Sequence, residues 1–169
     1  MTPTDWTSLA EWVTAFRALH EEARKGKLHA RDLARYHQDR EVLAKALLIA
    51  QRLSIKPGVT PRQTLRVGLT LPVELVGGTR SERATTLDLG VGGFAALFPK
   101  PMKVMEGFGF VLTLKGAGGA VSGRARVVNL QRKGKPFRVA FAFDDLPPAD
   151  SERISLEVFD AALATIPPK

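Results

Sequence analysis

Two arginines and one aspartate stand out among the charged residues because of their types and spacing. Arg62 and Arg66 lie four residues apart, just before the first apolar run of alternating pattern, and Asp88 begins the glycine-rich segment 88–93 (DLGVGG). Guanidinium groups form paired hydrogen bonds with phosphate oxygens and with the O6/N7 edge of guanine. A carboxylate accepts from the opposite guanine edge, and glycines let a backbone approach a ligand closely. Together these residue types suit a guanine nucleotide.

Other residue patterns offer less chemistry. His29 and His37 lie eight residues apart without a third ligand at a helical offset, and the chain has no cysteine, so we expect no metal site. Asp144 and Asp145 stand before Leu-Pro-Pro, where a turn or a helix cap is the favoured role. No lysine or helix follows the glycines of 88–93, which excludes a P-loop. The sequence therefore indicates a protein that is not an enzyme.

Charge and composition limit the class of partner. The 169 residues include 25 Lys and Arg against 17 Asp and Glu, a formal net charge of +8. This charge is spread along the chain, and its densest clusters, 24–27 and 132–135, are short, so we do not expect a nucleic-acid partner. No apolar run approaches a membrane span and no signal peptide is visible, so we expect a cytoplasmic protein without a membrane anchor.

The elements that must position these residues fall into two parts. Residues 4–25 and 30–53 show apolar residues at helical spacing, with Thr4 or Asp5 as N-cap and a short connection near Gly26, which predicts a helical hairpin. Lys56-Pro57-Gly58 marks a boundary. We therefore predict an N-terminal helical region, 1–56, and a second domain, 57–169.

The second domain has the pattern of a β-barrel. Six apolar runs separated by turn glycines predict six strands, at 65–75, 85–90, 92–98, 108–114, 121–130 and 137–143. Pro147-Pro148 then opens a last helix, 150–164. The predicted fold class is α+β: a six-stranded antiparallel barrel with a C-terminal helix, after an N-terminal helical hairpin. If neighbouring strands carry Arg66 and Asp88, the two side chains can meet at one rim.

Residues 61–163 resemble the PilZ domain family of bacterial cyclic di-GMP receptors. That family has an RxxxR motif before the first strand, matched by Arg62 and Arg66, and a (D/N)x(S/A)xxG motif, matched at its ends by Asp88 and Gly93. Gly90 departs from the motif, since the family prefers Ser or Ala there. The surroundings also match, at Leu71-Pro72-Val73, Thr86-Leu87-Asp88 and Val139-Ala140-Phe141.

The resemblance implies a non-enzymatic receptor with cyclic di-GMP as ligand rather than cofactor. Arg62 and Arg66 would grip guanine edges and phosphates, Asp88 would take the Watson–Crick edge of guanine, and Gly93 would give close approach. Gly90 lacks a hydroxyl, which we expect to weaken binding several-fold. For Arg132, Lys133 and Arg138 the pattern favours solvated surface over added charge at the ligand.

The resemblance also implies an output. By analogy with the family, the process would be motility, pilus function or exopolysaccharide control in a bacterium. Residues 4–54 carry more apolar residues than a lone hairpin can bury, so one face would pack on the barrel or on a second copy in a homodimer, and the rest would meet an unidentified protein partner. The alternative is a degenerate PilZ-like interaction module that no longer binds cyclic di-GMP.

Overall fold

The computed structural model describes residues 8–59, 62–116 and 119–168. It divides into two units. The helical unit comprises residues 1–65 and 162–169, and the barrel unit comprises residues 66–161. Each unit is described below by itself.

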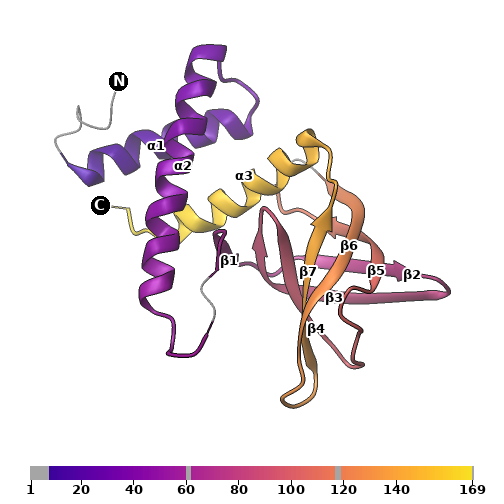
Figure 1. The fold of residues 1–169 in the computed structure, drawn as a ribbon. Coiled ribbons are helices and arrows are strands. Elements are labelled where there is room, and N and C mark those ends of the chain that lie inside the picture. Colours follow the sequence, from indigo (N-terminus) through magenta and orange to yellow (C-terminus); the bar gives the residue numbers. More distant parts are fainter. Residues whose placement is uncertain (1–7, 60–61, 117–118, 169) are drawn as a thin grey trace. The chain divides into compact units, whose positions relative to one another are not determined.

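The helical unit contains the expected pair of helices, α1 (Leu9–Arg24) and α2 (Ala30–Leu53) (Figure 1). Ser8 caps α1, its Oγ accepting from the Glu11 amide at 3.2 Å; the N-cap candidates Thr4 and Asp5 lie outside the described residues. The Gly26 and Lys27 amides donate back to α1 carbonyls, and Gly26 has a positive φ of 66°. This is a Schellman motif, and glycine is favoured there because its backbone is left-handed.

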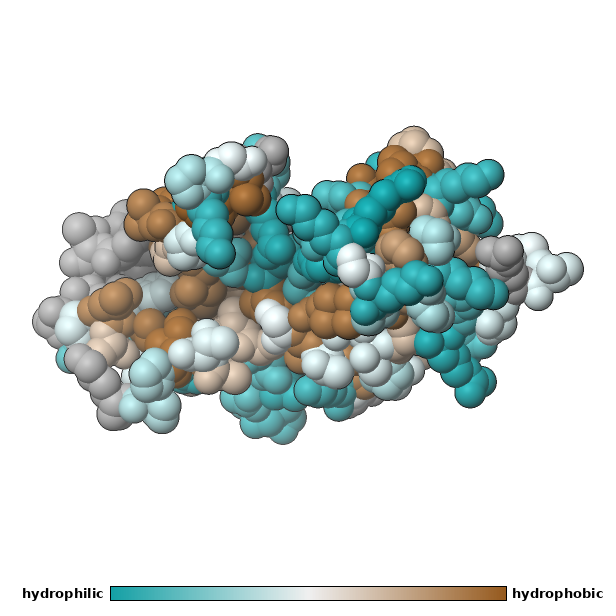
Figure 2. Space-filling view, turned by 90° about the horizontal axis from the view of Figure 1, so that it is seen from below, coloured by the Kyte–Doolittle hydropathy of each residue, from teal (hydrophilic) through white to brown (hydrophobic). Residues whose placement is uncertain are grey.

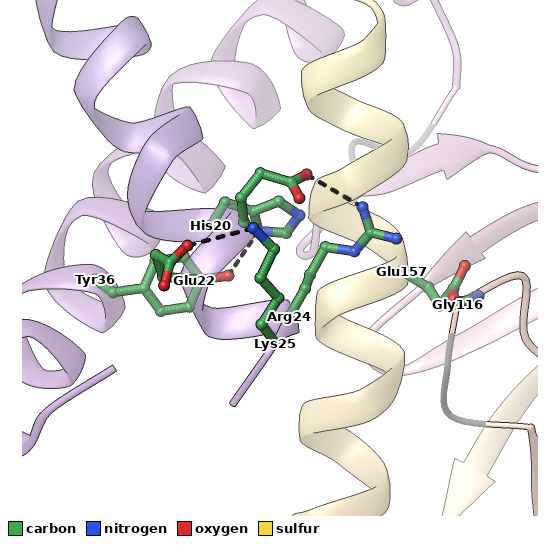
Figure 3. A network of polar contacts seen from close by, with 8 residues as sticks. His20, Glu22, Arg24, Lys25, Tyr36, Gly116 and Glu157 are labelled. Atoms are coloured by element: carbon green, nitrogen blue, oxygen red, sulfur yellow. Dashed lines mark hydrogen bonds and ion pairs between the residues drawn. The ribbon is translucent and has the colours of Figure 1, made fainter. Parts of the chain in front are cut away.

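Aromatic side chains hold the helical unit together. Trp12 stacks on Phe16 and Phe16 stacks on Tyr36, each pair with ring centroids 5.6 Å apart. His20 Nδ1 and the Tyr36 hydroxyl are hydrogen-bonded at 2.9 Å, and both residues are buried (Figure 3). Arg17 donates to the Leu163 carbonyl at 2.9 Å. One stacked cluster, with one buried hydrogen bond inside it, therefore joins α1 to α2.

The barrel unit is an antiparallel sheet closed on itself (Figure 1). The strand order is β1-β3-β2-β5-β6-β7-β4, and β3 also pairs with β4, which closes a six-stranded barrel as the sequence predicts. The strands are β1 (Arg66–Gly68), β2 (Pro72–Gly77), β3 (Arg80–Gly90), β4 (Gly93–Phe98), β5 (Gly107–Thr113), β6 (Ala120–Gln131) and β7 (Phe137–Asp144).

The first predicted strand, 65–75, is two strands in the structure. β1 and β2 pair with successive parts of the long strand β3, and the chain leaves the ladder between them. The buried Thr86 fills this break: its Oγ1 accepts from the Leu71 amide at 2.9 Å and donates to the Leu69 carbonyl. The alternation of apolar residues continues from β1 into β2. The sequence pattern therefore could not reveal the gap between these strands, which the Thr86 hydroxyl bridges from β3.

Phenylalanines fill the barrel. Phe94 stacks on Phe141 with centroids 4.9 Å apart, and Phe110 lies 5.0 Å from Phe143. The C-terminal helix α3 (Pro148–Ala164) starts at a proline, which suits the first helical position, and the Gly116 amide donates to Glu157 of α3 at 2.6 Å. Residues of α3 from Ala162 onward group with the helical unit.

Several large apolar side chains remain at the surface. On α2, Val42, Ile49 and Leu53 are 42%, 58% and 84% exposed. Figure 2 shows hydrophobic residues, in brown, at the surface among hydrophilic ones, in teal. No helix in the described ranges is long and apolar enough to cross a membrane.

Candidate functional site

The sheet register brings four of the five predicted site residues onto adjacent strands. Gly90, at the end of β3, pairs with Arg66 of β1 on one side and with Gly93 of β4 on the other. Asp88, two residues earlier on β3, pairs with Ala95 of β4. Because side chains alternate along a strand, Asp88 and Gly90 share one face of the sheet.

The Asp88 carboxylate lies between two arginines. Arg66 Nη1 donates to Oδ1 of Asp88 at 2.9 Å, and Arg138 Nη2 donates to Oδ2 at 2.6 Å. The exposed fractions of the three side chains are 17% for Arg66, 26% for Arg138 and 12% for Asp88. Charge-assisted hydrogen bonds in a partly buried place are stronger than surface ion pairs, so this cluster is held firmly.

The cluster keeps a positive charge. Two guanidinium groups outweigh one carboxylate, and each guanidinium carries several N–H donors in a rigid fork. Each carboxylate oxygen can also accept more than one hydrogen bond. The arrangement can therefore present donors to an anion while the carboxylate accepts from a base edge.

Arg62 lies in the helical unit, ahead of β1. Its carbonyl accepts from Nε and Nη2 of Arg52 on α2, at 3.0 and 2.8 Å. These hydrogen bonds come from an exposed side chain of α2 to the backbone at the first arginine of the RxxxR motif. The backbone at Arg66 pairs with Gly90 within the sheet.

The two motif glycines are in different surroundings. A Cβ on Gly93 would overlap the carbonyl oxygen of Phe141 on β7, so β4 and β7 can approach as they do only with glycine there. Gly90 lies within the strand ladder, and the two-residue turn Val91-Gly92 joins it to Gly93. The packing of β4 against β7 is therefore one reason for glycine at position 93, and this reason does not depend on a ligand.

Arg138 is not the solvated surface residue that the sequence pattern favours, because its side chain is 26% exposed and donates to Asp88. It lies on β7 and pairs with Leu97 of β4, so it reaches Asp88 on β3 across the intervening strand. The alternation within 137–143 puts Arg138 and Phe137 on opposite faces, which is a usable signal. However, Asp88 can be identified as the partner of Arg138 only when the pairing of β4 with β7 is also known.

The remaining candidates lie in ordinary surroundings. His29 and His37 are exposed, and Asp144 forms an ion pair with Arg126 of β6. Arg132 and Lys133 are exposed in the turn between β6 and β7. Among the described residues, no group of three or more His, Cys, Asp or Glu side chains could hold a metal ion.

Comparison with known proteins identifies the class to which this fold and site belong. Residues 60–160 match the model of the PilZ domain family. The chain belongs to this family. None of the curated proteins compared with the chain matches it significantly.

Solved structures show the same fold. The PilZ domain of YcgR from Escherichia coli, determined with c-di-GMP, superposes with a TM-score of 0.51 and 18% identity over 61% of this chain and 92% of that domain. MrkH from K. pneumonia, as its c-di-GMP complex, gives 0.56 and 17% over 66% of this chain and 56% of its own. The Bacillus subtilis inhibitor of motility MotI/DgrA gives 0.55 and 14%, over 63% of this chain and 53% of its own. The match thus spans about half of MotI/DgrA and of MrkH.

Proposed function

We propose that this chain is a non-enzymatic receptor for cyclic di-GMP that couples nucleotide binding at the barrel to a protein partner. The observation that carries the proposal is the contact between Arg66 and Asp88, at 2.9 Å, which joins residues of both family motifs. Membership of the PilZ family and the likeness to c-di-GMP complexes of YcgR and MrkH support the choice of ligand. We place the receptor in the bacterial cytoplasm.

In this proposal the arginines and the aspartate divide the recognition of the nucleotide. Arg62 and Arg66 bind guanine edges and phosphates, and Asp88 accepts from the Watson–Crick edge of guanine. Gly93 leaves the sheet surface low beside them, and Gly90 offers no hydroxyl where the family usually has one. The net positive charge of the cluster favours a ligand with two phosphates.

The output follows from where the two arginines lie. Arg62 and Arg66 lie on the segment that follows α2 and leads into β1, so a ligand held by both arginines would fix the path of this segment. We propose that the helical unit meets the partner, through the exposed apolar residues of α2 or through a second copy of the chain. Control of motility, pili or exopolysaccharide is the process we propose, and the likeness to an inhibitor of motility agrees with it.

A second candidate is a degenerate PilZ module that acts through protein contacts without a nucleotide. Gly90 favours it, because the missing hydroxyl removes a hydrogen bond worth about 0.5–1.5 kcal/mol. Arg66 and Asp88, which supply the charged contacts, are both present. The candidates differ in one measurable property, the affinity for cyclic di-GMP.

Isothermal titration of the full chain with cyclic di-GMP tests the proposal. We expect saturable binding, and a loss of affinity of at least about tenfold in Arg62→Ala and in Arg66→Ala, because charged hydrogen bonds contribute about 1.5–3 kcal/mol each. Arg83→Ala is the matched control: it removes the same charge from β3, at a side chain that is 85% exposed. Circular dichroism should show the same fold in all three variants.

Two results would contradict the proposal. No binding by the unaltered chain would favour the degenerate module. Equal affinities for the unaltered chain, Arg62→Ala and Arg66→Ala would place the ligand elsewhere on the molecule.

A further inference from the structure

Two connections of the barrel unit lie at the end of β4 that is away from the family motifs. β4 runs from Gly93, the last residue of the second motif, to Phe98, which pairs with Phe137 at the start of β7. The β4–β5 connection, 99–106, therefore starts beside the end of the β6–β7 turn, 132–136. Figure 1 shows both connections at the lower end of the barrel unit. We name these two segments together the basic end, because of the side chains that they carry.

The basic end carries five cationic side chains. All five are exposed, and none forms an ion pair with an acidic side chain of residues 8–59, 62–116 or 119–168: they are Lys100, Lys103, Arg132, Lys133 and Lys135. Glu106 is the one acidic residue in the two segments, and its Oε2 accepts from the backbone amide of Lys103 at 3.1 Å. Such a cluster of positive charge attracts anions to this end of the barrel.

Two exposed apolar side chains accompany these cations. Val104 is 56% exposed and Met105 is 69% exposed. Met105 has a positive φ of 71°, in the left-handed region that a side chain such as methionine rarely adopts. Its amide donates to the Val127 carbonyl of β6 at 2.7 Å, which holds the loop in this conformation. The strained backbone costs stability and displays an apolar side chain to solvent, so the folding of the barrel alone does not explain methionine there.

We propose that the basic end docks the protein on an anionic lipid surface. Val104 and Met105 enter the headgroup layer, and the five cations lie against the lipid phosphates and carboxylates. Each Lys or Arg near an anionic bilayer adds to the attraction, and the apolar side chains add contact that neutral water does not offer. The association is reversible and needs no spanning helix. It goes beyond the proposed function, because it uses none of the residues that we assign to the nucleotide.

The residue types favour a lipid surface over other polyanions. A nucleic acid offers phosphates but no apolar layer for Met105. Protein interfaces are depleted in lysine, whereas four of the five cations are lysines. Lysine is a compact point charge, which suits diffuse attraction to a fluid layer of headgroups better than paired recognition of one phosphate.

Co-sedimentation of the full chain with vesicles tests the charges. We expect binding to vesicles of phosphatidylcholine mixed with phosphatidylserine but not to phosphatidylcholine alone, and binding that weakens as salt is added. A chain with both Lys133→Gln and Lys135→Gln should bind at least about tenfold more weakly. The matched control is a chain with both Lys27→Gln and Lys45→Gln, which loses the same charge at exposed positions of the helical unit and should bind like the unaltered chain.

A change at Met105 separates docking from stability. Asparagine tolerates the left-handed backbone better than methionine, so Met105→Asn should unfold at an equal or higher temperature. The same variant should bind the mixed vesicles at least about threefold more weakly, because it removes the exposed apolar side chain. If Met105→Asn instead unfolds at a lower temperature, Val104→Asn decides by the same loss of binding.

Several results would overturn the inference. These are binding to neither kind of vesicle, equal binding to both, or an equal loss in the lysine pair of the basic end and in the control pair. Unchanged vesicle binding by the asparagine variant that decides, together with tight binding of a short DNA duplex, would reassign the basic end to nucleic acid. All measurements are made without cyclic di-GMP, so the failure of this inference leaves the proposed function untouched.

Discussion

The helical unit and the barrel unit both contain stacked aromatic rings, but different forces define them. In the barrel, a closed ladder of backbone pairs sets the structure, and the phenylalanines fill the space that it leaves. In the helical unit, the stack of Trp12, Phe16 and Tyr36 joins two helices that have no shared backbone ladder. The barrel should therefore respond most to changes in backbone approach, and the hairpin to changes in single side chains.

The two units also differ in what they expose. Beside Asp88 the barrel exposes parts of two arginine side chains, 17% of Arg66 and 26% of Arg138, which suit a small anionic ligand. Helix α2 exposes Ile49 and Leu53, which suit a protein surface. This contrast supports our proposal that the barrel unit binds the ligand and the helical unit meets the partner.

The largest effect is expected from removal of the helical hairpin, which tests whether the barrel unit folds and binds the ligand by itself. A chain that begins at Lys56 keeps every barrel strand and both RxxxR arginines. We expect it to fold, because the β3–β4 pairing closes the barrel within residues 66–161, and to keep most of its cyclic di-GMP affinity while losing the protein partner. Circular dichroism, titration and a partner pull-down measure these three properties. An unfolded or insoluble product would show that the hairpin is part of the barrel's core.

A methyl group at Gly93 is expected to have the next largest effect. In Gly93→Ala the new Cβ would meet the Phe141 carbonyl, and backbone cannot move aside as a side chain can. We expect the barrel to lose about 3 kcal/mol or more of stability, at the upper end of overpacking costs. Gly92→Ala is the control, because no atom lies within 4 Å of a Cβ there. Denaturant unfolding that finds the two variants equally stable would contradict the close approach of β4 and β7.

Removal of the Tyr36 hydroxyl tests how much a single side-chain contact contributes to the stability of the helical unit. In Tyr36→Phe the ring remains in the stack, but His20 Nδ1 loses its partner at 2.9 Å in a buried place. We expect a loss of about 1–3 kcal/mol from the helical unit. Cyclic di-GMP affinity should stay unchanged. Near-ultraviolet circular dichroism of the tryptophans follows the hairpin, because Trp12 belongs to the stack; an unaltered melting profile would show that the bond contributes nothing.

Much of the fold could be predicted from periodicity, and the places where it fails have physical reasons. The helices at 9–24 and 30–53 and the closed six-stranded barrel agree with the apolar spacing. The break between β1 and β2 depends on the Thr86 side chain from another strand, and the contact of Arg138 with Asp88 depends on a register across β4. Local patterns do not contain such long-range pairing. For the same reason, the motif that contains Gly93 does not reveal that glycine is needed there for the close approach of β4 and β7.

The smallest effect is expected at Gly90, where the chain departs from the family motif. Gly90 is the last residue of β3 and pairs on both sides, with Arg66 and with Gly93, so its backbone is in a strand that serine can adopt. We expect Gly90→Ser to tighten cyclic di-GMP binding several-fold, because one added hydroxyl contributes about 0.5–1.5 kcal/mol. Titration measures the gain, and thermal unfolding should show an unchanged midpoint. Weaker binding with a lower midpoint would mean that the rim lacks room for a side chain. Glycine at position 90 would then serve the approach of β1 and β4 to β3, as Gly93 serves that of β4 to β7.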